Sequence, residues 1–445
     1  MSATMGSLRQ RVMRSGGITA GGFAADQILR FGSNLVLTRL LFPEAFGIMA
    51  IMQAVVVGVT MLSDVGVAQS IVRHARGAEP SFINTAWTIQ IIKGALMALV
   101  LWGASGTLAR AYHQPLLEGM MPWAALASLA AGFTSTKVAL ANRNVDALRV
   151  TMVSVGALAV GILASIAFAQ HNPTPYALVW GNLVAAIANV AGSHVFLHGP
   201  ANRPQWSRAV AVSILSFGGW VMLSSAVGYM TGEGNKLVVA SMLDIRLLGL
   251  FGLASTLSVV VARAVGSMGS QVLFPAYSEL FRDNPSRLSH AVERARRVQI
   301  APVWAAAWVF AFFGPQIVHL LYDPRYADAG IVLQILAIGS MVSVLNNSFA
   351  GVLWAMGRVG LSTAILAGQM LLQMAGIVIG HWLFGQVGAL VGLAASGWAL
   401  YPFHATVYAR LGIWHPRTDV PVLAASTVAG AASFFFIDWA RAGAW

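Results

Sequence analysis

Apolar stretches of about 20 residues recur along the whole 445-residue chain, and each is long enough for a helix to cross a bilayer. Hydrophobic residues make up 57% of the sequence and charged residues 9%, whereas soluble proteins carry about 25% charged residues. The mean hydropathy is +0.72. The chain is therefore predicted to be an all-α polytopic membrane protein.

The hydropathy pattern predicts about 13 transmembrane helices, within a range of 12 to 14. The predicted spans are 17–41, 45–71, 83–109, 117–139, 149–170, 176–197, 209–241, 248–272, 299–321, 329–355, 360–382, 386–409 and 419–440.

The charge pattern predicts the orientation of these spans. A formal net charge of +12 would suggest a nucleic-acid partner for a soluble protein, but the positive-inside rule explains it more simply here. Most of the 27 Lys and Arg residues fall in alternate loops, on the side that also holds the N-terminus. We therefore expect a cytoplasmic N-terminus and no nucleic-acid partner.

Two short pairs of segments indicate an internal repeat. "NLVLTRLLFPEAFG" (34–47) aligns with "KLVVASMLDIRLLG" (236–249), and "AYHQPLLEGMMPWAALA" (111–127) aligns with "LYDPRYADAGIVLQILA" (321–337). Each aligned pair crosses equivalent outward turns, so two six-helix halves of the same orientation are predicted. This is a transporter arrangement, with the substrate bound between the halves.

The domain organisation follows from this repeat. The predicted parts are a cytoplasmic N-terminal tail (1–16), an N-terminal lobe of helices one to six (17–197), a cytoplasmic linker (198–208), a C-terminal lobe of helices seven to twelve (209–409) and an extra C-terminal helix (410–445). The longest polar segment, 278–299, is predicted to be either a basic amphipathic helix or a solvated linker.

Three basic residues, Arg30, Lys93 and Arg263, fall well inside the first, third and eighth spans. A charge at such a depth costs about 3 kcal/mol when it faces lipid, so each base needs a partner or a cavity. Asp26, Arg30 and Asn34 follow one another at four-residue spacing, hence on one helix face. Asp26 and Arg30 are therefore either a structural pair or part of a cavity wall.

Lys93 and Arg263 have no acid within a turn in their own spans. Lys93 follows Gln90 by three residues, and Arg263 begins a polar stripe in "VVVARAVGSMGSQ". Each base could serve a function, or it could equally be a structural residue that extends to the membrane surface or donates to backbone carbonyls. Taken together, three such bases predict a cationic cavity for an anionic substrate, and the forked guanidinium suits phosphate.

Other polar residues have a structural and a functional reading. Asp64, near the inner end of the second span, is predicted to end that helix or to couple to protons, and Glu233 is predicted to pair with Lys236 or to couple to an ion. Ser216 and Ser224 lie on a serine stripe that suits sugar hydroxyls or helix packing.

The sequence contains none of the enzyme motifs that we considered. The sequence contains no H-E-x-x-H, no nucleophile elbow and no P-loop. It has no cysteine, which excludes disulfides and thiolate metal sites, and its histidines are scattered without metal-ligand spacing. The predicted outward loops are too short to hold a catalytic domain. We expect a transporter without a cofactor or metal, driven by an ion gradient or by use of its product.

Seven segments, in order along the chain, resemble the bacterial polysaccharide (O-antigen-type) flippase family of the multidrug/oligosaccharidyl-lipid/polysaccharide exporter superfamily. The resemblance runs from about residue 20 to residue 400. These segments are "RFGSNLVLTRLLFPEAFG", "DVGVAQSIVR", "FINTAW", "ANRNVDALRV", "NKLVVASMLDIRLLGLFGLAS", "VLFPAYSEL" and "LYDPRYADAGIVLQILA".

The resemblance implies two pseudo-symmetric lobes that form a V around a central cationic cavity. It implies alternating access that moves an undecaprenyl-diphosphate-linked oligosaccharide from the cytoplasmic to the periplasmic leaflet of the bacterial inner membrane, for exopolysaccharide, O-antigen or capsule synthesis. Related flippases place bases of the first and eighth spans near the diphosphate, where Arg30 and Arg263 stand here; Lys93 is added by position. The implied partners are the lipid bilayer, a polysaccharide polymerase with its chain-length machinery, and a proton or sodium gradient linked to Asp26.

Two alternatives stay open. One is an ion-coupled multidrug or small-molecule exporter of the same fold, which would need buried acids facing a cavity. The other is a membrane enzyme of glycan assembly, which the short outward loops disfavour.

Overall fold

The computed structural model describes residues 2–144, 146–232, 234–268, 273–283, 285–349, 351–443 and 445. The side chains at 2–16, 220, 223, 224, 227, 230–232, 264, 266–268, 274–276, 282, 283, 285, 286 and 359 lie outside this description. Every regular element within the described residues is a helix. The predicted all-α class is confirmed.

The chain divides into two compact units, residues 1–233 and 234–445. The predicted linker 198–208 lies inside the first unit, because its backbone is held by the fourth helix. The N–H of Gln205 donates to Thr88 Oγ1 at 3.1 Å, and the N–H of Ser207 donates to Thr85 Oγ1 at 3.1 Å. The helix that follows (Arg208–Gly232) belongs to the first unit as well, so the boundary falls within the predicted seventh span, 209–241.

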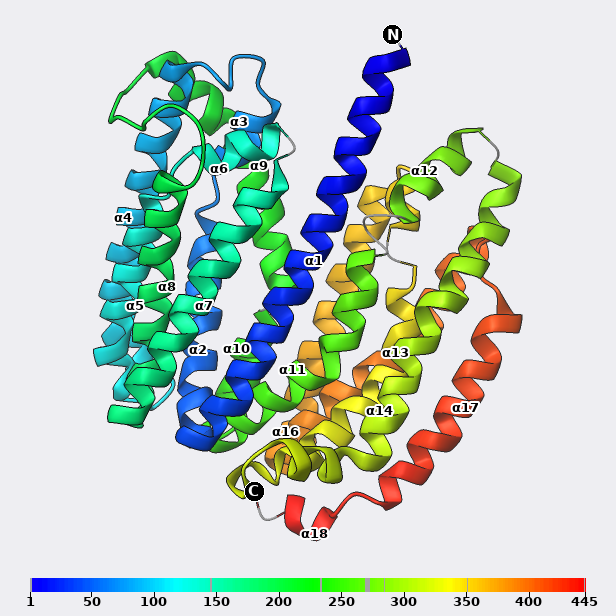
Figure 1. The fold of residues 1–445 in the computed structure, drawn as a ribbon. Helices are drawn as coiled ribbons and strands as arrows, with labels where there is room; N and C mark the ends of the chain where they lie inside the picture. The colour runs from blue at the N-terminus through cyan, green and yellow to red at the C-terminus, as the bar shows by residue number, and fades with distance from the viewer. Residues whose placement is uncertain are drawn as a thin grey trace. The chain divides into compact units, whose positions relative to one another are not determined.

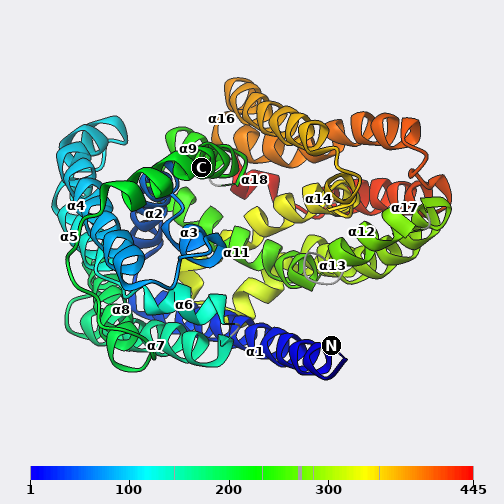
Figure 2. The ribbon, with the colours of Figure 1, turned by 90° about the horizontal axis from the view of Figure 1, so that it is seen from above.

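The first unit contains nine helices in its described part (Figure 1). They are α1 (Ser2–Leu40), α2 (Pro43–Leu62), α3 (Val67–Arg73), α4 (Pro80–Ala111), α5 (Leu116–Gly132), α6 (Lys137–Arg143), α7 (Ala147–His171), α8 (Tyr176–Val195) and α9 (Arg208–Gly232). Seen from above, α4, α5, α8 and α7 lie side by side, and α1 packs along α7 (Figure 2).

Two predicted spans of this unit are interrupted. Span 45–71 ends as a helix at Leu62, and Gly66 adopts a left-handed conformation (φ 63°) before α3 begins. The Asp64 carboxylate stabilises this turn by accepting the N–H of Gly66 at 3.1 Å. Span 117–139 is divided between α5 and α6, which meet at an angle of 56°. Asp64 thus lies in the turn just beyond the end of α2.

The second unit contains longer and more irregular helices (Figure 1). They are α10 (Gly234–Met242), α11 (Ile245–Met268), α12 (Phe274–Asp283), α13 (Pro285–Leu321), the 3-10 helix η2 (Pro324–Tyr326), α14 (Ala329–Asn347), α15 (Val352–Ala355), α16 (Val359–Arg410), α17 (Pro416–Phe435) and α18 (Trp439–Ala442). α14 is the central helix of this unit and packs against α11, α13, α16 and α17.

The polar segment 278–299 belongs to α12 and α13 in its described residues, which excludes the solvated-linker reading. Its apolar side chains Leu288 and Val292 are buried against Phe349, Leu353 and neighbouring residues. The apolar face of this amphipathic segment therefore packs into a hydrophobic cluster of the second unit.

α16 comprises two helices joined at a sharp turn. Phe384 and Gly385 leave helical geometry, and Gly385 takes φ 63° and ψ −146°, a conformation that favours glycine. The two halves match the predicted spans 360–382 and 386–409. They pack so closely that a Cβ added at Gly380 would overlap the carbonyl group of Gly388, and one added at Gly392 would overlap that of Gly376. Small residues of this kind allow helices to approach closely in membranes.

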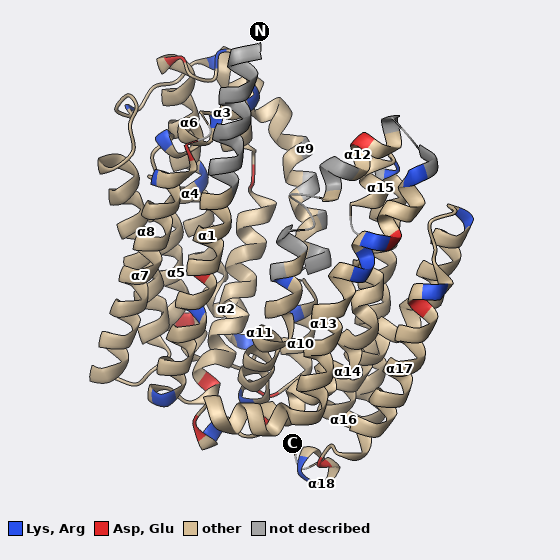
Figure 3. Ribbon diagram, turned by 45° about the vertical axis from the view of Figure 1, so that its right-hand side comes forward, with Lys and Arg blue, Asp and Glu red and all other residues tan. Residues whose placement is uncertain are grey.

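Nine helices of the described chain are long and apolar enough to cross a membrane, or ten if α5 and α6 form one bent span. α16 is counted once although it contains two predicted spans, so the predicted number of 13 stays a prediction. Most of the length of the long helices carries neither acidic nor basic residues (Figure 3). This distribution is the one expected of helices that cross a bilayer.

Four helix ends agree with the predicted internal repeat. α1 ends at Leu40 and α10 ends at Met242, which is the offset of 202 that aligned the first pair of segments. α4 ends at Ala111 and α13 ends at Leu321, which is the offset of 210 of the second pair. The two units therefore share the register of these turns.

Gly380→Ala is expected to lower stability by about 1–3 kcal/mol, because the added methyl group overlaps the backbone of the facing half of α16. The measurement is the thermal unfolding midpoint of the purified protein in detergent. Gly368→Ala is the matched control: it lies on the same helix with nothing within 4 Å of its added Cβ, and should be neutral or stabilising. Equal midpoints for the two variants would contradict the close packing.

Candidate functional site

The acid and the base of α1 form the predicted pair. Arg30 Nε donates to Asp26 Oδ2 at 2.8 Å, and Arg30 Nη2 donates to Asp26 Oδ1 at 3.3 Å. The side chains remain 60% and 30% exposed, respectively, and Asn34 follows one turn later, half-buried. The pair therefore leaves much of the guanidinium accessible to a ligand.

Arg263 and Ser216 are exposed on helices of the two different units. Arg263 lies near the end of α11, and the described part of the chain provides it with no hydrogen-bond or ion-pair partner. Ser216 lies on α9 and donates to the carbonyl of Ser213 in its own helix at 3.2 Å. The side chain of Ser224 and the whole of Glu233 lie outside the described residues.

Lys93 is partly neutralised by an acid in the turn between α2 and α3, which its own span did not reveal. Its Nζ lies 3.7 Å from Asp64 Oδ1, with side-chain exposures of 21% and 28%. The distance exceeds that of a hydrogen bond, so the ammonium group has a counter-charge without a close acceptor. Gln90, one turn earlier, donates from Nε2 to the carbonyl of Thr134 at 3.0 Å.

Lys93 and Gln90 line a cavity of about 370 Å³ inside the first unit. Residues from α2, α4, α5 and α8 form its wall. The polar lining residues are Gln53, Thr60, Gln90, Lys93, Ser128 and Asn182, and the remainder are Met, Val, Ala and Gly. Gly94 and Gly132 belong to this wall, and their Cα atoms come so close that side chains would not fit between α4 and α5.

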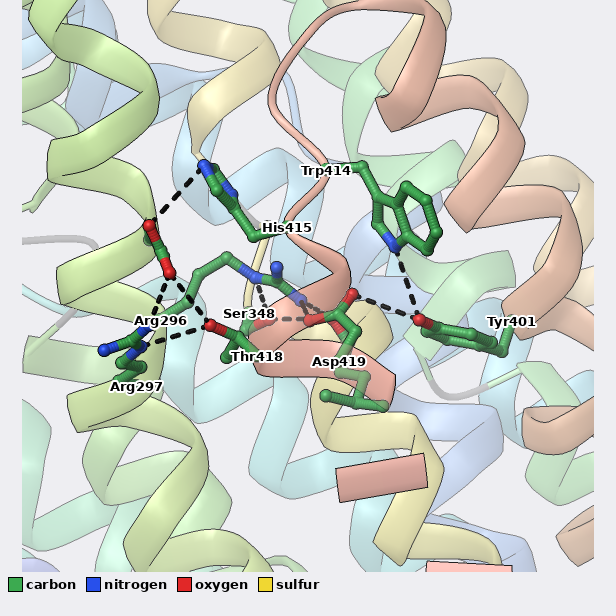
Figure 4. A network of polar contacts seen from close by, with 10 residues as sticks. Arg296, Arg297, Ser348, Tyr401, Trp414, His415, Thr418 and Asp419 are labelled. Atoms are coloured by element: carbon green, nitrogen blue, oxygen red, sulfur yellow. Dashed lines mark hydrogen bonds and ion pairs between the residues drawn. The ribbon is translucent and has the colours of Figure 1, made fainter. Parts of the chain in front are cut away.

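The second unit contains a buried ion pair that the sequence analysis missed (Figure 4). Arg296, on α13, falls in the polar segment 278–299, yet its side chain is 0% exposed. Its Nη2 lies 2.9 Å from Oδ1 of the equally buried Asp419, on α17. Arg296 Nε also donates to Ser348 Oγ at 2.8 Å, and the guanidinium lies 3.6 Å above the ring of Phe349.

Further polar contacts extend this pair towards the loop between α16 and α17 (Figure 4). Tyr401 donates its hydroxyl to Asp419 Oδ2 at 3.2 Å, and Arg297 Nε donates to Thr418 Oγ1 at 3.1 Å. Burial lowers the pKa of His415 in that loop, although the nearby Glu293 acts in the opposite direction. The network ties α13, α14, α16 and α17 together.

Sequence signals for these contacts were present but weak. Asp419 stands three residues after Pro416, at the start of an apolar stretch. The nearby Arg417 suggested a local partner, so there was no reason to search for a distant one. Nothing in the sequence pairs Asp64 with Lys93, because Asp64 lies in the turn after α2 and Lys93 lies on α4. Gln53 and Asn182 carried no distinguishing pattern.

Comparison with known proteins gives the family. A family model described as "Polysaccharide biosynthesis protein" matches residues 36–331, well over half of the chain. The chain belongs to this family. The predicted resemblance is thereby confirmed.

Curated relatives support the assignment. The lipopolysaccharide biosynthesis protein WzxC of Escherichia coli (strain K12) is 21% identical over 362 residues, which are 80% of this chain and 72% of that protein. The succinoglycan biosynthesis transport protein ExoT of Rhizobium meliloti (strain 1021) is 24% identical over 342 residues, 74% of this chain and 66% of that protein.

Solved structures show the same fold. An inward-facing multidrug resistance MATE family transporter of the MOP superfamily matches with a TM-score of 0.72 at 15% identity, over 87% of this chain and 94% of that one. The lipid II flippase MurJ, in an inward closed conformation, matches with a TM-score of 0.68 at 11% identity, over 93% and 92%. This member of the polysaccharide biosynthesis family thus has a transporter fold.

Asp419→Ala is expected to destabilise the protein by about 3–5 kcal/mol, because it leaves the buried Arg296 charge without its counter-charge. The thermal unfolding midpoint in detergent measures the effect. The double variant Arg296→Met/Asp419→Leu should recover most of the loss, since both charges are then absent.

The matched control is Glu79→Ala, which removes the exposed Arg76–Glu79 pair and should leave the midpoint unchanged. A midpoint of Asp419→Ala equal to that of the wild type would show that the buried pair does not stabilise the fold.

Proposed function

We propose that this protein is a flippase that moves an undecaprenyl-diphosphate-linked oligosaccharide from the cytoplasmic to the periplasmic leaflet of the bacterial inner membrane, by alternating access. The observation that carries the proposal is the presence of two exposed guanidinium groups, Arg30 on α1 and Arg263 near the end of α11. Family membership and the names of WzxC and ExoT support a role in polysaccharide export.

The physical task explains why such residues would be retained. A diphosphate bearing a sugar chain must pass about 30 Å of hydrocarbon, while its polyprenyl tail can remain in lipid. A guanidinium group binds phosphate oxygens through paired N–H donors. Asp26 would hold Arg30 in position before the cargo arrives, since the pair is already formed at 2.8 Å. The diphosphate would then repay the cost of keeping the base in the membrane.

Energy would come from an ion gradient or from consumption of the product, since the sequence has no nucleotide-binding motif. Asp26 is the acid that we propose to link to protons or sodium, with Asp64 as a second candidate. The charge distribution supports a cytoplasmic N-terminus. A polysaccharide polymerase and its chain-length machinery would receive the translocated unit.

A multidrug or small-molecule exporter is the second candidate, because the fold is also that of the MATE transporter. Cationic drugs require unpaired acids in the binding site. In the described residues Asp26 and Asp64 each lie beside a base, which favours an anionic cargo.

Arg30→Ala is expected to abolish, or to reduce at least tenfold, the transfer of a fluorescent undecaprenyl-diphosphate oligosaccharide between the leaflets of proteoliposomes. The loss of a charge-assisted contact to phosphate costs about 1.5–3 kcal/mol, which is a factor of 10 or more. Arg30→Lys should restore transfer only in part, because an ammonium group lacks the fork.

Arg110→Ala is the matched control, since Arg110 is an exposed arginine at the end of α4. It should leave transfer unchanged. Transfer by Arg30→Ala at the wild-type rate would contradict the proposal that Arg30 binds the diphosphate. Failure of the folded wild type to move the probe, together with export of a cationic dye, would favour the drug exporter.

A further inference from the structure

The cavity of the first unit has polar groups that the diphosphate site does not use. It is lined on α2 by Gln53, on α4 by Gln90 and Lys93, and on α8 by Asn182. Arg30 is not among the lining residues. The cavity is therefore a separate place in the fold where a ligand could bind.

The charges around this cavity cancel. Lys93 contributes one positive charge, and Asp64 contributes one negative charge at 3.7 Å. A diphosphate placed there would bring at least two negative charges against a site of zero net charge, at the cost of uncompensated charge in a low dielectric. An uncharged ligand meets no such penalty. The charge balance thus argues against the diphosphate as the occupant.

The hydrogen-bonding groups indicate a ligand with several hydroxyl groups. Within the described part of the chain, the side-chain amides of Gln53 and Asn182 are exposed and have no hydrogen-bond partner, and the carbonyl oxygen of the Gln90 amide accepts none. The Lys93 ammonium has three donors and no acceptor within hydrogen-bond distance. Amides both donate and accept, as sugar hydroxyls do, so the two sets of groups are complementary.

The size and the remaining lining agree with this ligand class. A volume of about 370 Å³ lies within the range of small-molecule sites, which are mostly apolar with a few placed polar groups. Met52, Val56 and Met97 supply such an apolar wall. The apolar faces of a sugar ring can pack against these side chains while its hydroxyl groups reach the amides.

We propose that this cavity binds a sugar of the cargo's oligosaccharide through Gln53, Asn182, Gln90 and the Lys93–Asp64 pair, and that the diphosphate is bound elsewhere. The proposal rests on the flippase function proposed above and extends it, because the cavity would let the protein select cargo by its carbohydrate. Lys93, assigned to the diphosphate by its position in the sequence, becomes a sugar-binding residue.

The test compares two probes on the purified full-length protein in detergent. One is the lipid-linked repeat unit extracted from the bacterium that produces the protein, and the other is bare undecaprenyl diphosphate. Native mass spectrometry gives the affinity for each. The wild type should prefer the sugar-bearing lipid, and Gln53→Leu and Asn182→Leu should each reduce that preference about fivefold, as expected for the loss of one hydrogen bond.

Gln170→Leu is the matched control, because Gln170 is an exposed amide near the end of α7 and does not line the cavity. It should keep the wild-type preference, and Arg30→Ala should weaken the binding of both probes by the same factor. Thermal unfolding midpoints equal to that of the wild type verify folding of every variant.

The remaining outcomes separate the two proposals. An unchanged preference in Gln53→Leu and Asn182→Leu would overturn the sugar site and leave the flippase function intact. An equal loss of both probes in these variants would also overturn it, because the tail or the diphosphate would then occupy the cavity. Binding of neither probe by the folded wild type would refute the flippase function, and the sugar site with it.

Discussion

Hydrocarbon offers no hydrogen-bond partner to a charge or to a backbone amide, and this constraint underlies every part of the structure. It requires long helices, which satisfy their own backbone groups, and it requires a reason for each charge between their ends. Arg30 has Asp26 on its own helix, Lys93 has Asp64 from the turn after α2, and Arg296 has Asp419 from α17. The three pairs differ in burial. The fully buried pair has a structural role, and the two more exposed pairs are those for which we propose a ligand.

The most buried pair is structural. Arg296 and Asp419 are fully enclosed, and their hydrogen bonds join four helices of the second unit. Removing one partner of such a pair is expensive, although replacing both with apolar residues is often neutral. The pair therefore specifies which helix ends meet more than it adds to stability. It connects the last long helix, α17, to the preceding ones.

The less buried pairs are suited to ligands. Arg30 is held by Asp26 yet mostly exposed, and Lys93 has a counter-charge yet no close acceptor. In both cases the base has a nearby counter-charge and retains donors for the ligand that we propose. The close approach of α4 and α5 at Gly94 and Gly132 shapes the wall of the cavity beside Lys93. Charge pairing and small-residue packing thus act together in the first unit.

Much of the fold could be read from the sequence, because helix length, apolar runs and turn residues are local properties. The ends of α1, α4, α10 and α13 repeat at the predicted offsets, and the two halves of α16 match two predicted spans. Interruptions were harder to predict: the break after Leu62 depends on a left-handed Gly66 held by Asp64. A hydropathy average over about 20 residues does not detect a turn of this length.

The sequence by itself determined the helical class, the offsets of the aligned turns and the spacing of Asp26 and Arg30, since these follow from composition and position along the chain. The Asp26–Arg30 pair belongs to this group, because residues four apart share a helix face. Only the tertiary structure decided that Lys93 meets Asp64, that Arg296 is buried against Asp419, and that Gln53 and Asn182 border one cavity. Those contacts join helices distant in the chain, and their geometry depends on how the helices pack.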